Sequence, residues 1–140
     1  MFGFQAAGAA PLVLGHDVEN PETVATAIRI GKPASGSKAL AARDDSNGLI
    51  SSVTDEQILD AQAFLAAKEG IFVEPASAAG VAGLLALKQS GDLPAGQRIV
   101  ITVTGNGLKD IDTALSRTEL STEAVEPSTD RVAALLGLHQ

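Results

Sequence analysis

Apolar and polar positions recur in short blocks along the chain, and the clearest block has helical spacing. Apolar side chains follow Thr54 at intervals of three and four residues: Ile58, Ala61, Phe64 and Leu65. Thr54 and Gln57 have the spacing of a capping box, and Gly70 ends the pattern. The pattern predicts a capped helix that begins after Thr54 and buries one face.

Four other segments have the composition of strands or extended chain. Phe2–Gln5 opens the chain, and Gly48–Val53 and Ile71–Val73 are short apolar runs. Arg98–Thr104 is rich in β-branched residues and apolar on both faces, as a central parallel strand covered by helices is. We expect the last of these to be a core strand.

Start and stop signals predict four further helices. Each begins at a capping residue or a proline and ends near a glycine or a polar run, and the expected ranges are Pro21–Ile30, Pro75–Gln89, Ile111–Ser116 and Thr129–Leu136. The stretch Lys32–Asn47 has no clear period, so it is expected to be a loop with one weak helical turn near Lys38–Arg43. Strands that alternate with helices indicate the α/β class with a parallel sheet.

Composition narrows the classes of function. The 140 residues are 45% hydrophobic and 19% charged, which suits one globular unit. A net charge of -7 and 3% aromatic residues argue against nucleic-acid binding. Without cysteine, and with only His16 and His139, the chain offers neither disulfides nor a histidine-rich metal site.

The N-terminus and the hydropathy of the chain indicate where in the cell the protein is expected. No apolar run approaches the roughly 20 residues that a bilayer span needs, and no basic leader precedes the first strand, so no membrane role and a cytoplasmic location are expected. Met1 leads straight into a strand without a polar lead-in. From the residues alone, a short edge strand of a complete small protein is the favoured interpretation, and a chain that begins inside a domain is the alternative.

Candidate chemistry gathers where the expected strand Arg98–Thr104 ends. Thr104 is followed by Gly105, Asn106 and Gly107. Ligands of open α/β sheets lie beyond the carboxyl ends of the strands, so a polar group there is a candidate ligand contact. Because the third glycine of a dinucleotide loop is missing, a simple tight turn is an equally good interpretation.

Glu74 is the second candidate. It stands between Val73 and Pro75, so we expect its carboxylate to be partly buried and to need a partner or a function. Hydrogen bonds to nearby backbone amides are the structural alternative. Gly31-Lys32 lacks the upstream glycine of a phosphate loop, and Ser35-Gly36-Ser37-Lys38 lacks the other motifs of a serine–lysine hydrolase.

Four blocks in order along the chain resemble the C-terminal part of threonine synthase, a pyridoxal-phosphate enzyme family of fold type II. The blocks are Gly3–Pro11, Ala25–Gly31, Glu74–Ala79 and Thr104–Asp110. Related dehydratases and racemases share the Glu-Pro turn and the late glycine turn, but the other blocks favour threonine synthase. Lys32, Gly36 and Ile111 depart from the family, which usually has Asn, Trp and Pro there.

The resemblance implies a cofactor, a reaction and a set of cofactor-binding residues. The family uses pyridoxal phosphate to convert O-phospho-L-homoserine and water into L-threonine and phosphate. The matching positions are Thr104, whose hydroxyl would bond the pyridine nitrogen, Ala27 against the ring, and Gly105, Asn106 and Glu74 around it. On this resemblance, residues 1–117 form the C-terminal part of the catalytic domain, and residues 118–140 form a polar linker with a helix.

The resemblance also implies what this sequence lacks. The Schiff-base lysine and the Gly-Asn-rich phosphate loop precede this region in the family, and none of the five lysines has the matching context. The expected fold is therefore an incomplete one that needs the N-terminal part of the enzyme as its partner, with a homodimer when complete, and is inactive alone. Two alternatives remain open: another fold type II enzyme related to threonine or serine dehydratase, and a non-catalytic small-molecule-binding or scaffold α/β protein.

Overall fold

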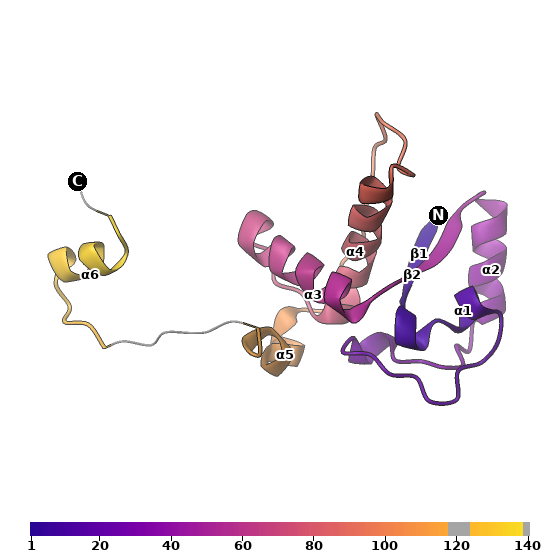
Figure 1. The fold of residues 1–140 in the computed structure, drawn as a ribbon, viewed down its shortest axis with the longest axis horizontal. Coiled ribbons are helices and arrows are strands. Elements are labelled where there is room, and N and C mark those ends of the chain that lie inside the picture. The colour runs from indigo at the N-terminus through magenta and orange to yellow at the C-terminus, as the bar shows by residue number, and fades with distance from the viewer. Residues whose placement is uncertain (118–123, 139–140) are drawn as a thin grey trace.

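The centre of the fold is a two-stranded parallel sheet (Figure 1). The computed structural model describes residues 1–117 and 124–138. Strand β1 (Phe2–Ala6) pairs with β2 (Leu49–Val53) in a register that sets Phe2 opposite Leu49. The strands lie between α2 on one side and α3 and α4 on the other, which confirms the α/β class.

Helix α3 (Asp55–Phe64) has the capping box that the sequence predicts. The Gln57 backbone N–H donates to Thr54 Oγ1 at 3.2 Å, and the Thr54 N–H donates to Gln57 Oε1 at 2.9 Å. The helix continues as the π-helical turn η3 (Leu65–Glu69) and ends at Gly70, whose φ is 66°. The expected apolar face is right at Ile58, Ala61 and Leu65, but Phe64 is turned outward and is 42% exposed.

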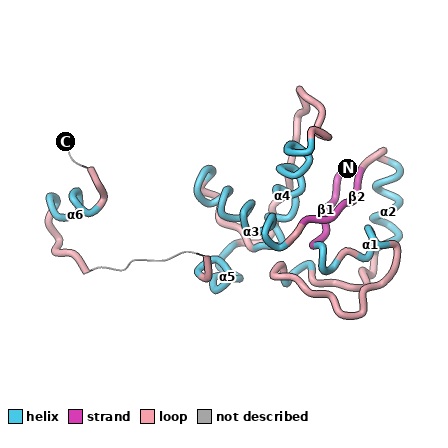
Figure 2. The backbone as a smooth tube through the Cα atoms, in the orientation of Figure 1, coloured by secondary structure: helices cyan, strands magenta, loops and turns pink. Residues whose placement is uncertain are grey.

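Three more predicted helices are present at the expected places (Figure 2). They are α4 (Pro75–Ser90), α5 (Ile111–Leu115) and α6 (Thr129–Leu135). The Ser128 side chain caps α6 by accepting from the Arg131 N–H, and Gly137 follows with φ 66°. Of the expected linker to α6, residues 118–123 lie outside the described part of the chain.

The expected helix over Pro21–Ile30 is wrong. Only the single turn η2 (Thr26–Ile28) is helical, and groups distant in sequence hold the residues before it. The Glu22 N–H donates to the carbonyl of Gly8, in the turn η1 (Ala7–Ala9), and the Val24 N–H donates to the Asp55 carboxylate. Long-range partners therefore override the local start signal.

The expected loop Lys32–Asn47 is also wrong. It contains the ten-residue helix α2 (Gly36–Asp45), preceded by the short helix α1 (Pro11–Leu14) earlier in the crossover. Helix α2 buries no residue completely, so it has no apolar stripe for a periodicity argument to detect. Its alanines, leucine, lysine and arginine are good helix formers, and that propensity is the signal that periodicity misses.

The expected core strand Arg98–Thr104 is the third correction. This segment is extended but pairs with no strand in the part of the chain that the structure describes, and Val100 is 89% exposed. Only Ile101 packs against the core cluster. The expected extended segment before α4 is confirmed, and Val73 forms one antiparallel bridge with Asn106.

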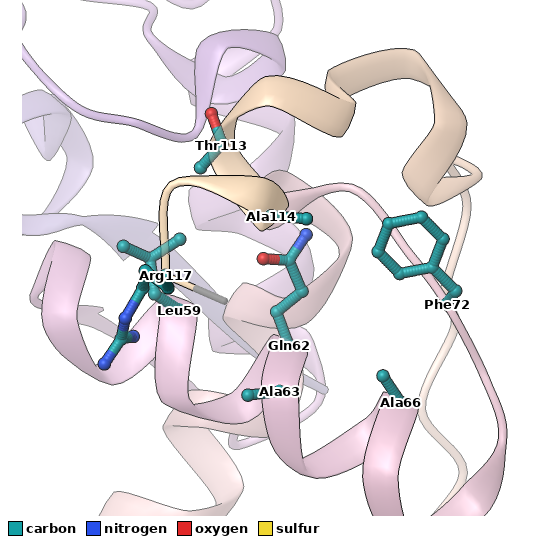
Figure 3. A pocket seen from close by; sticks show the side chains of 8 residues that line it. All are labelled: Leu59, Gln62, Ala63, Ala66, Phe72, Thr113, Ala114 and Arg117. Atoms are coloured by element: carbon teal, nitrogen blue, oxygen red, sulfur yellow. The ribbon is translucent and has the colours of Figure 1, made fainter. Parts of the chain in front are cut away.

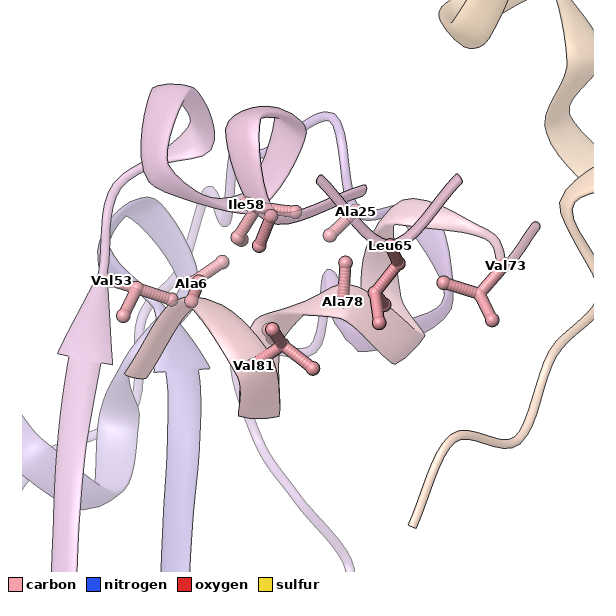
Figure 4. Close-up of a cluster of buried hydrophobic side chains, with 11 residues drawn as sticks. Ala6, Ala25, Val53, Ile58, Leu65, Val73, Ala78 and Val81 are labelled. Atoms are coloured by element: carbon pink, nitrogen blue, oxygen red, sulfur yellow. The ribbon is translucent and has the colours of Figure 1, made fainter. Parts of the chain in front are cut away.

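The core is made of small and branched side chains between α3, α4 and the strand ends (Figure 4). Ile58, Val53 and Pro75 are its largest fully buried side chains. Several members are alanines, so the elements approach closely: a Cβ added to Gly83 of α4 would overlap the Phe4 ring of β1. In the described part of the chain, no helix has the length and hydropathy that a membrane span requires.

Candidate functional site

Thr104 and Gly105 are held by the side chain of Ser77 in the first turn of α4. The Gly105 N–H donates to Ser77 Oγ at 2.7 Å, and the Thr104 N–H donates to the same oxygen at 3.2 Å. Thr104 Oγ1 lies 3.1 Å from Ser77 Oγ. Ser77 is 6% exposed while Thr104 is exposed, so a buried hydroxyl fixes the position of an accessible one.

The turn after Thr104 is tied to the segment that precedes α4. The Glu74 N–H donates to the Gly105 carbonyl at 3.0 Å, and the Gly107 N–H donates to the Phe72 carbonyl at 3.1 Å. A Cβ on Gly105 would overlap the Glu74 carboxylate and force that side chain to move, so glycine allows the close approach. The end of the extended segment is therefore fixed although the segment has no strand partner.

Glu74 has the partial burial that the sequence predicts, with a side chain that is 12% exposed. Its carboxylate lies 4.0 Å from Lys109 Nζ. Lys109 follows the glycine turn in the sequence, so this ion pair adds a second link across the turn. The partner of the Glu74 carboxylate is thus the side-chain ammonium of Lys109, which follows the glycine turn.

A cavity of about 710 Å³ opens beside Thr104. Its walls come from β1, from α4 and from the extended segment, and they include Phe2, Phe4, Ser77, Gly80, Ile101 and Thr104. Most of the lining is apolar, and its polar side chains are those of Ser77, Gln97, Arg98, Thr102 and Thr104. Such a cavity suits a ligand with an apolar body and polar groups at its edges.

The five residues expected at the site are only partly brought together. Thr104 lines the cavity, whereas Gly105 is buried behind it with Glu74. The Asn106 side chain accepts from the Leu108 N–H at 2.9 Å and so caps the turn η4 (Gly107–Asp110). Ala27 is exposed in η2, which packs against α4.

Two residues important to this arrangement escaped the sequence analysis. Ser77 is one, and its signal is a hydroxyl in the first turn of a helix that begins with Pro75. Asp55 is the other, because its carboxylate accepts from the Thr23 hydroxyl and the Val24 N–H and so fixes the segment before Ala27. Local sequence gives no signal for that contact, since Asp55 fits equally well in the first turn of α3.

A smaller cavity of about 220 Å³ lies between α3 and α5 (Figure 3). Leu59, Phe72 and Arg117 are among its lining residues, and Gln62 uses its amide Nε2 to donate to the Val73 carbonyl at 2.8 Å. Arg117 also pairs with Asp60 of α3 at 2.9 Å. The polar groups here are engaged in holding α5 and the segment around Val73 against α3.

The lysines lie away from both cavities. Lys32, Lys38, Lys68, Lys88 and Lys109 are all exposed, and neither cavity has a lysine in its lining. Lys32 Nζ is 2.9 Å from Asp17, and this hydrogen bond and charge attraction raise the pKa of Lys32. A nucleophilic lysine needs a lowered pKa, so the environment of Lys32 is opposite to that requirement.

The fold and the site define a class of protein that comparison with known families identifies. Residues 1–105 match the family model described as pyridoxal-phosphate dependent enzyme. The chain belongs to this family.

Its similarity is to threonine synthases in particular. It is 52% identical over 138 residues to the threonine synthase of Synechocystis sp. and 58% identical over 115 residues to that of Mycobacterium leprae. These matches cover 98% and 82% of this chain but only 36% and 32% of the relatives. The chain therefore spans about a third of the length of the curated relatives that it matches, in their C-terminal part.

Solved structures support the fold. A threonine deaminase from T.th. aligns with a TM-score of 0.53 at 22% identity and covers 71% of this chain and 40% of its own. A fungal L-serine ammonia-lyase from Rhizomucor miehei gives 0.57 at 20% identity, covering 83% and 40%. The fold is that of part of a fold type II pyridoxal-phosphate enzyme.

The residues on this chain fit one side of pyridoxal phosphate. Thr104 offers a neutral hydroxyl in the lining of a mainly apolar cavity, which suits an aromatic ring with a nitrogen acceptor. A lysine for covalent attachment does not line that cavity among the described residues. The Thr104 hydroxyl fits the pyridine side of the cofactor, and the described lining has no lysine for its aldehyde.

Proposed function

We propose that this chain supplies the pyridine-side wall of the active site of a threonine synthase, which converts O-phospho-L-homoserine and water into L-threonine and phosphate. The identity of 48% to 58% to threonine synthases over most of this chain supports that reaction over the dehydratase alternative. The dehydratase-like neighbours, at 20% and 22% identity, support only the fold.

The observation that carries the proposal is the hydroxyl of Thr104 at the cavity edge. When bound, pyridoxal phosphate supplies the electron sink for the carbon chemistry. Thr104 would donate a hydrogen bond to the ring nitrogen and so favour its unprotonated form. A neutral donor moderates the sink, because it adds no positive charge to the ring.

The other expected residues have supporting roles in this proposal. Gly105 lets the turn approach Glu74, and Glu74 with Lys109 fixes the turn on which Thr104 stands. Asn106 caps the next turn with its side chain. Ala27, on the loop fixed by Asp55, would contact the ring from the other side, where a larger side chain would take up the space that the ring needs.

The proposal assigns residues 1–117 to the catalytic domain and residues 118–140 to a linker and helix. The catalytic lysine and the phosphate loop would come from the part of a threonine synthase that this chain does not match. A homodimer of the complete enzyme and a cytoplasmic location belong to the same proposal. The chain by itself is expected to be inactive, because none of its lysines lines the cavity.

The test joins this chain to the part of the Synechocystis threonine synthase that it does not match. We expect the joined protein to bind pyridoxal phosphate and to form threonine from O-phospho-L-homoserine, whereas the 140-residue chain alone does neither. Thr104→Val should lower turnover of the joined protein by roughly 10- to 100-fold, because the ring nitrogen loses its donor at a cost of about 1–3 kcal/mol. Thr104→Ser keeps the donor and should retain most turnover.

Thr129→Val, in the exposed first turn of α6, is the control for the same change of side chain. Equal turnover and equal cofactor spectra in the Thr104→Val and Thr129→Val proteins would overturn the role of Thr104. Dehydration of serine or threonine without use of O-phospho-L-homoserine would favour the dehydratase alternative.

A further inference from the structure

The hydroxyl of Ser77 has three polar neighbours, and two of them can only donate. The backbone N–H groups of Gly105 and Thr104 reach Ser77 Oγ at 2.7 and 3.2 Å. The third neighbour is Thr104 Oγ1, 3.1 Å away, and this contact permits either oxygen to be the donor. The direction of that last bond decides what Thr104 can offer to a ligand.

The capacity of a hydroxyl group settles the direction. A serine oxygen has two lone pairs and one proton. The two N–H donors occupy both lone pairs, so Ser77 Oγ has only its proton left for Thr104. The Ser77 hydroxyl therefore donates to Thr104 Oγ1, and Thr104 accepts.

This direction leaves the proton of Thr104 free for the cavity. If Ser77 Oγ accepted from Thr104, the Thr104 proton would be used in that internal hydrogen bond. A ligand in the cavity would then meet only a lone pair of Thr104 Oγ1. Thr104 is exposed and lines the cavity of about 710 Å³ together with Ser77. With the internal acceptor filled, the Thr104 hydroxyl can satisfy its proton only with water or a ligand.

We infer that Ser77 is a positioning residue that keeps Thr104 as a hydrogen-bond donor toward the cavity. The ligand atom that pairs with this proton is a hydrogen-bond acceptor, and an unprotonated aromatic ring nitrogen is of this class. The identification of that atom with the cofactor rests on the proposed function, whereas the direction of the hydrogen bond does not. The two backbone bonds also orient Thr104, because they fix the chain on both sides of its carbonyl.

The decisive measurement is the location of the proton between the two oxygens in the full chain. We expect nuclear magnetic resonance to show a slowly exchanging Ser77 hydroxyl proton close in space to the Thr104 methyl group, while the Thr104 hydroxyl proton exchanges rapidly with water. Neutron diffraction should find deuterium bonded to Ser77 Oγ and directed at Thr104 Oγ1. A proton bonded to Thr104 and directed at Ser77 would overturn the inference, and this measurement needs no substitution.

A matched pair of variants tests the same point through chemistry. Ser77→Asn and Ser77→Asp have side chains of nearly equal size, but the ionised carboxylate can only accept. In Ser77→Asp, Thr104 should turn its proton inward, so its hydroxyl exchange slows relative to Ser77→Asn. Equal exchange in two folded variants would contradict the inference, and if either fails to fold, the proton location in the parent chain decides.

The anchoring role has a separate readout. Ser77→Ala removes the acceptor of the Gly105 N–H, so its amide exchange should accelerate roughly tenfold, the effect of losing about one hydrogen bond. Ser90→Ala is the matched control, since Ser90 is an exposed serine of the same helix whose hydroxyl donates to the Leu87 carbonyl. Unchanged Gly105 exchange in Ser77→Ala would show that Ser77 does not hold the turn.

The outcomes for the inference and for the proposed function are independent. A Ser77 proton directed at Thr104, together with full turnover of Thr104→Val, would overturn the function and keep the hydrogen-bond direction. The reverse direction, together with a large loss in Thr104→Val, would keep the function and remove Ser77 from it.

Discussion

Two β-prone segments of this chain have opposite outcomes. Leu49–Val53, with two serines at its centre, forms β2 in register with β1 and ends at the buried Val53. Arg98–Thr104, with a nearly continuous run of β-branched residues, pairs with no strand and exposes Val100. The difference shows that a strand depends on its neighbour more than on its own composition.

Geometry explains the outcome. Paired strands lie about 4.8 Å apart, so a segment without a strand at that distance leaves its backbone groups unpaired. Residues of β1 and residues Gln97 to Thr102 both line the cavity of about 710 Å³, and the two segments do not pair with each other. The hydrogen bonds of Arg98–Thr104 are therefore concentrated at its end, where Ser77 binds Thr104.

The sharpest test applies one substitution to both segments. Val53→Ala removes two buried methyl groups from the core and should lower the free energy of unfolding by about 2–3 kcal/mol. Val100→Ala makes the same change at a side chain that is 89% exposed and should cost less than about 0.5 kcal/mol. Urea denaturation followed by circular dichroism measures both, and equal losses would show that Arg98–Thr104 is packed in solution.

The sequence predicted best where local signals and final packing agree. The capping box at Thr54, the proline at the start of α4 and the glycine after α6 each act within one turn, and the structure has all three. Prediction failed at Pro21–Ile30, where the Asp55 carboxylate and the Gly8 carbonyl, both distant in sequence, hold the segment through hydrogen bonds to Val24 and Glu22. Prediction also failed at α2. This helix has no fully buried residue, so its sequence lacks the regular spacing of apolar residues that would indicate a helix.

The sequence marked residues of the candidate site where a local signal exists and missed residues where none exists. The strand-to-glycine transition marked Thr104, and the Val-Glu-Pro context marked the burial of Glu74. The sequence could not identify Ser77 as a partner of this turn. Thr104 and Gly105 lie 27 and 28 positions after Ser77, and only folding brings them within hydrogen-bond distance of it. The resemblance to threonine synthase came from short blocks of sequence and needed no knowledge of that contact.

Helix caps extend the comparison from strands to helices. Thr54→Ala removes the cap of α3, which packs on the core, and should lower the free energy of unfolding by about 1 kcal/mol. Ser128→Ala removes the cap of α6, a helix with no buried residue, and should leave the main thermal transition unchanged. A loss of similar size in both variants would mean that α6 is part of the cooperative unit.

The smallest effect on stability, and a clear effect on association, is expected at Val100. Val100→Lys places a charge on the exposed face of Arg98–Thr104, where it removes little buried area and should change the free energy of unfolding by less than about 0.5 kcal/mol. An unpaired extended run of β-branched residues is a template for pairing between chains, and a lysine opposes that pairing by repulsion and hydration. Light scattering and binding of the dye ANS should both decrease relative to the parent chain.

The control for this effect on association is Ile30→Lys, since Ile30 is 49% exposed on a loop outside the extended segment. Both variants change the net charge by the same amount, but only Val100→Lys places the lysine on the segment that has no strand partner. If Ile30→Lys lowers scattering as much as Val100→Lys does, net charge and not the unpaired segment governs association. If neither variant differs from the parent, Arg98–Thr104 does not act as a free edge, and the contrast with β2 does not extend to solution.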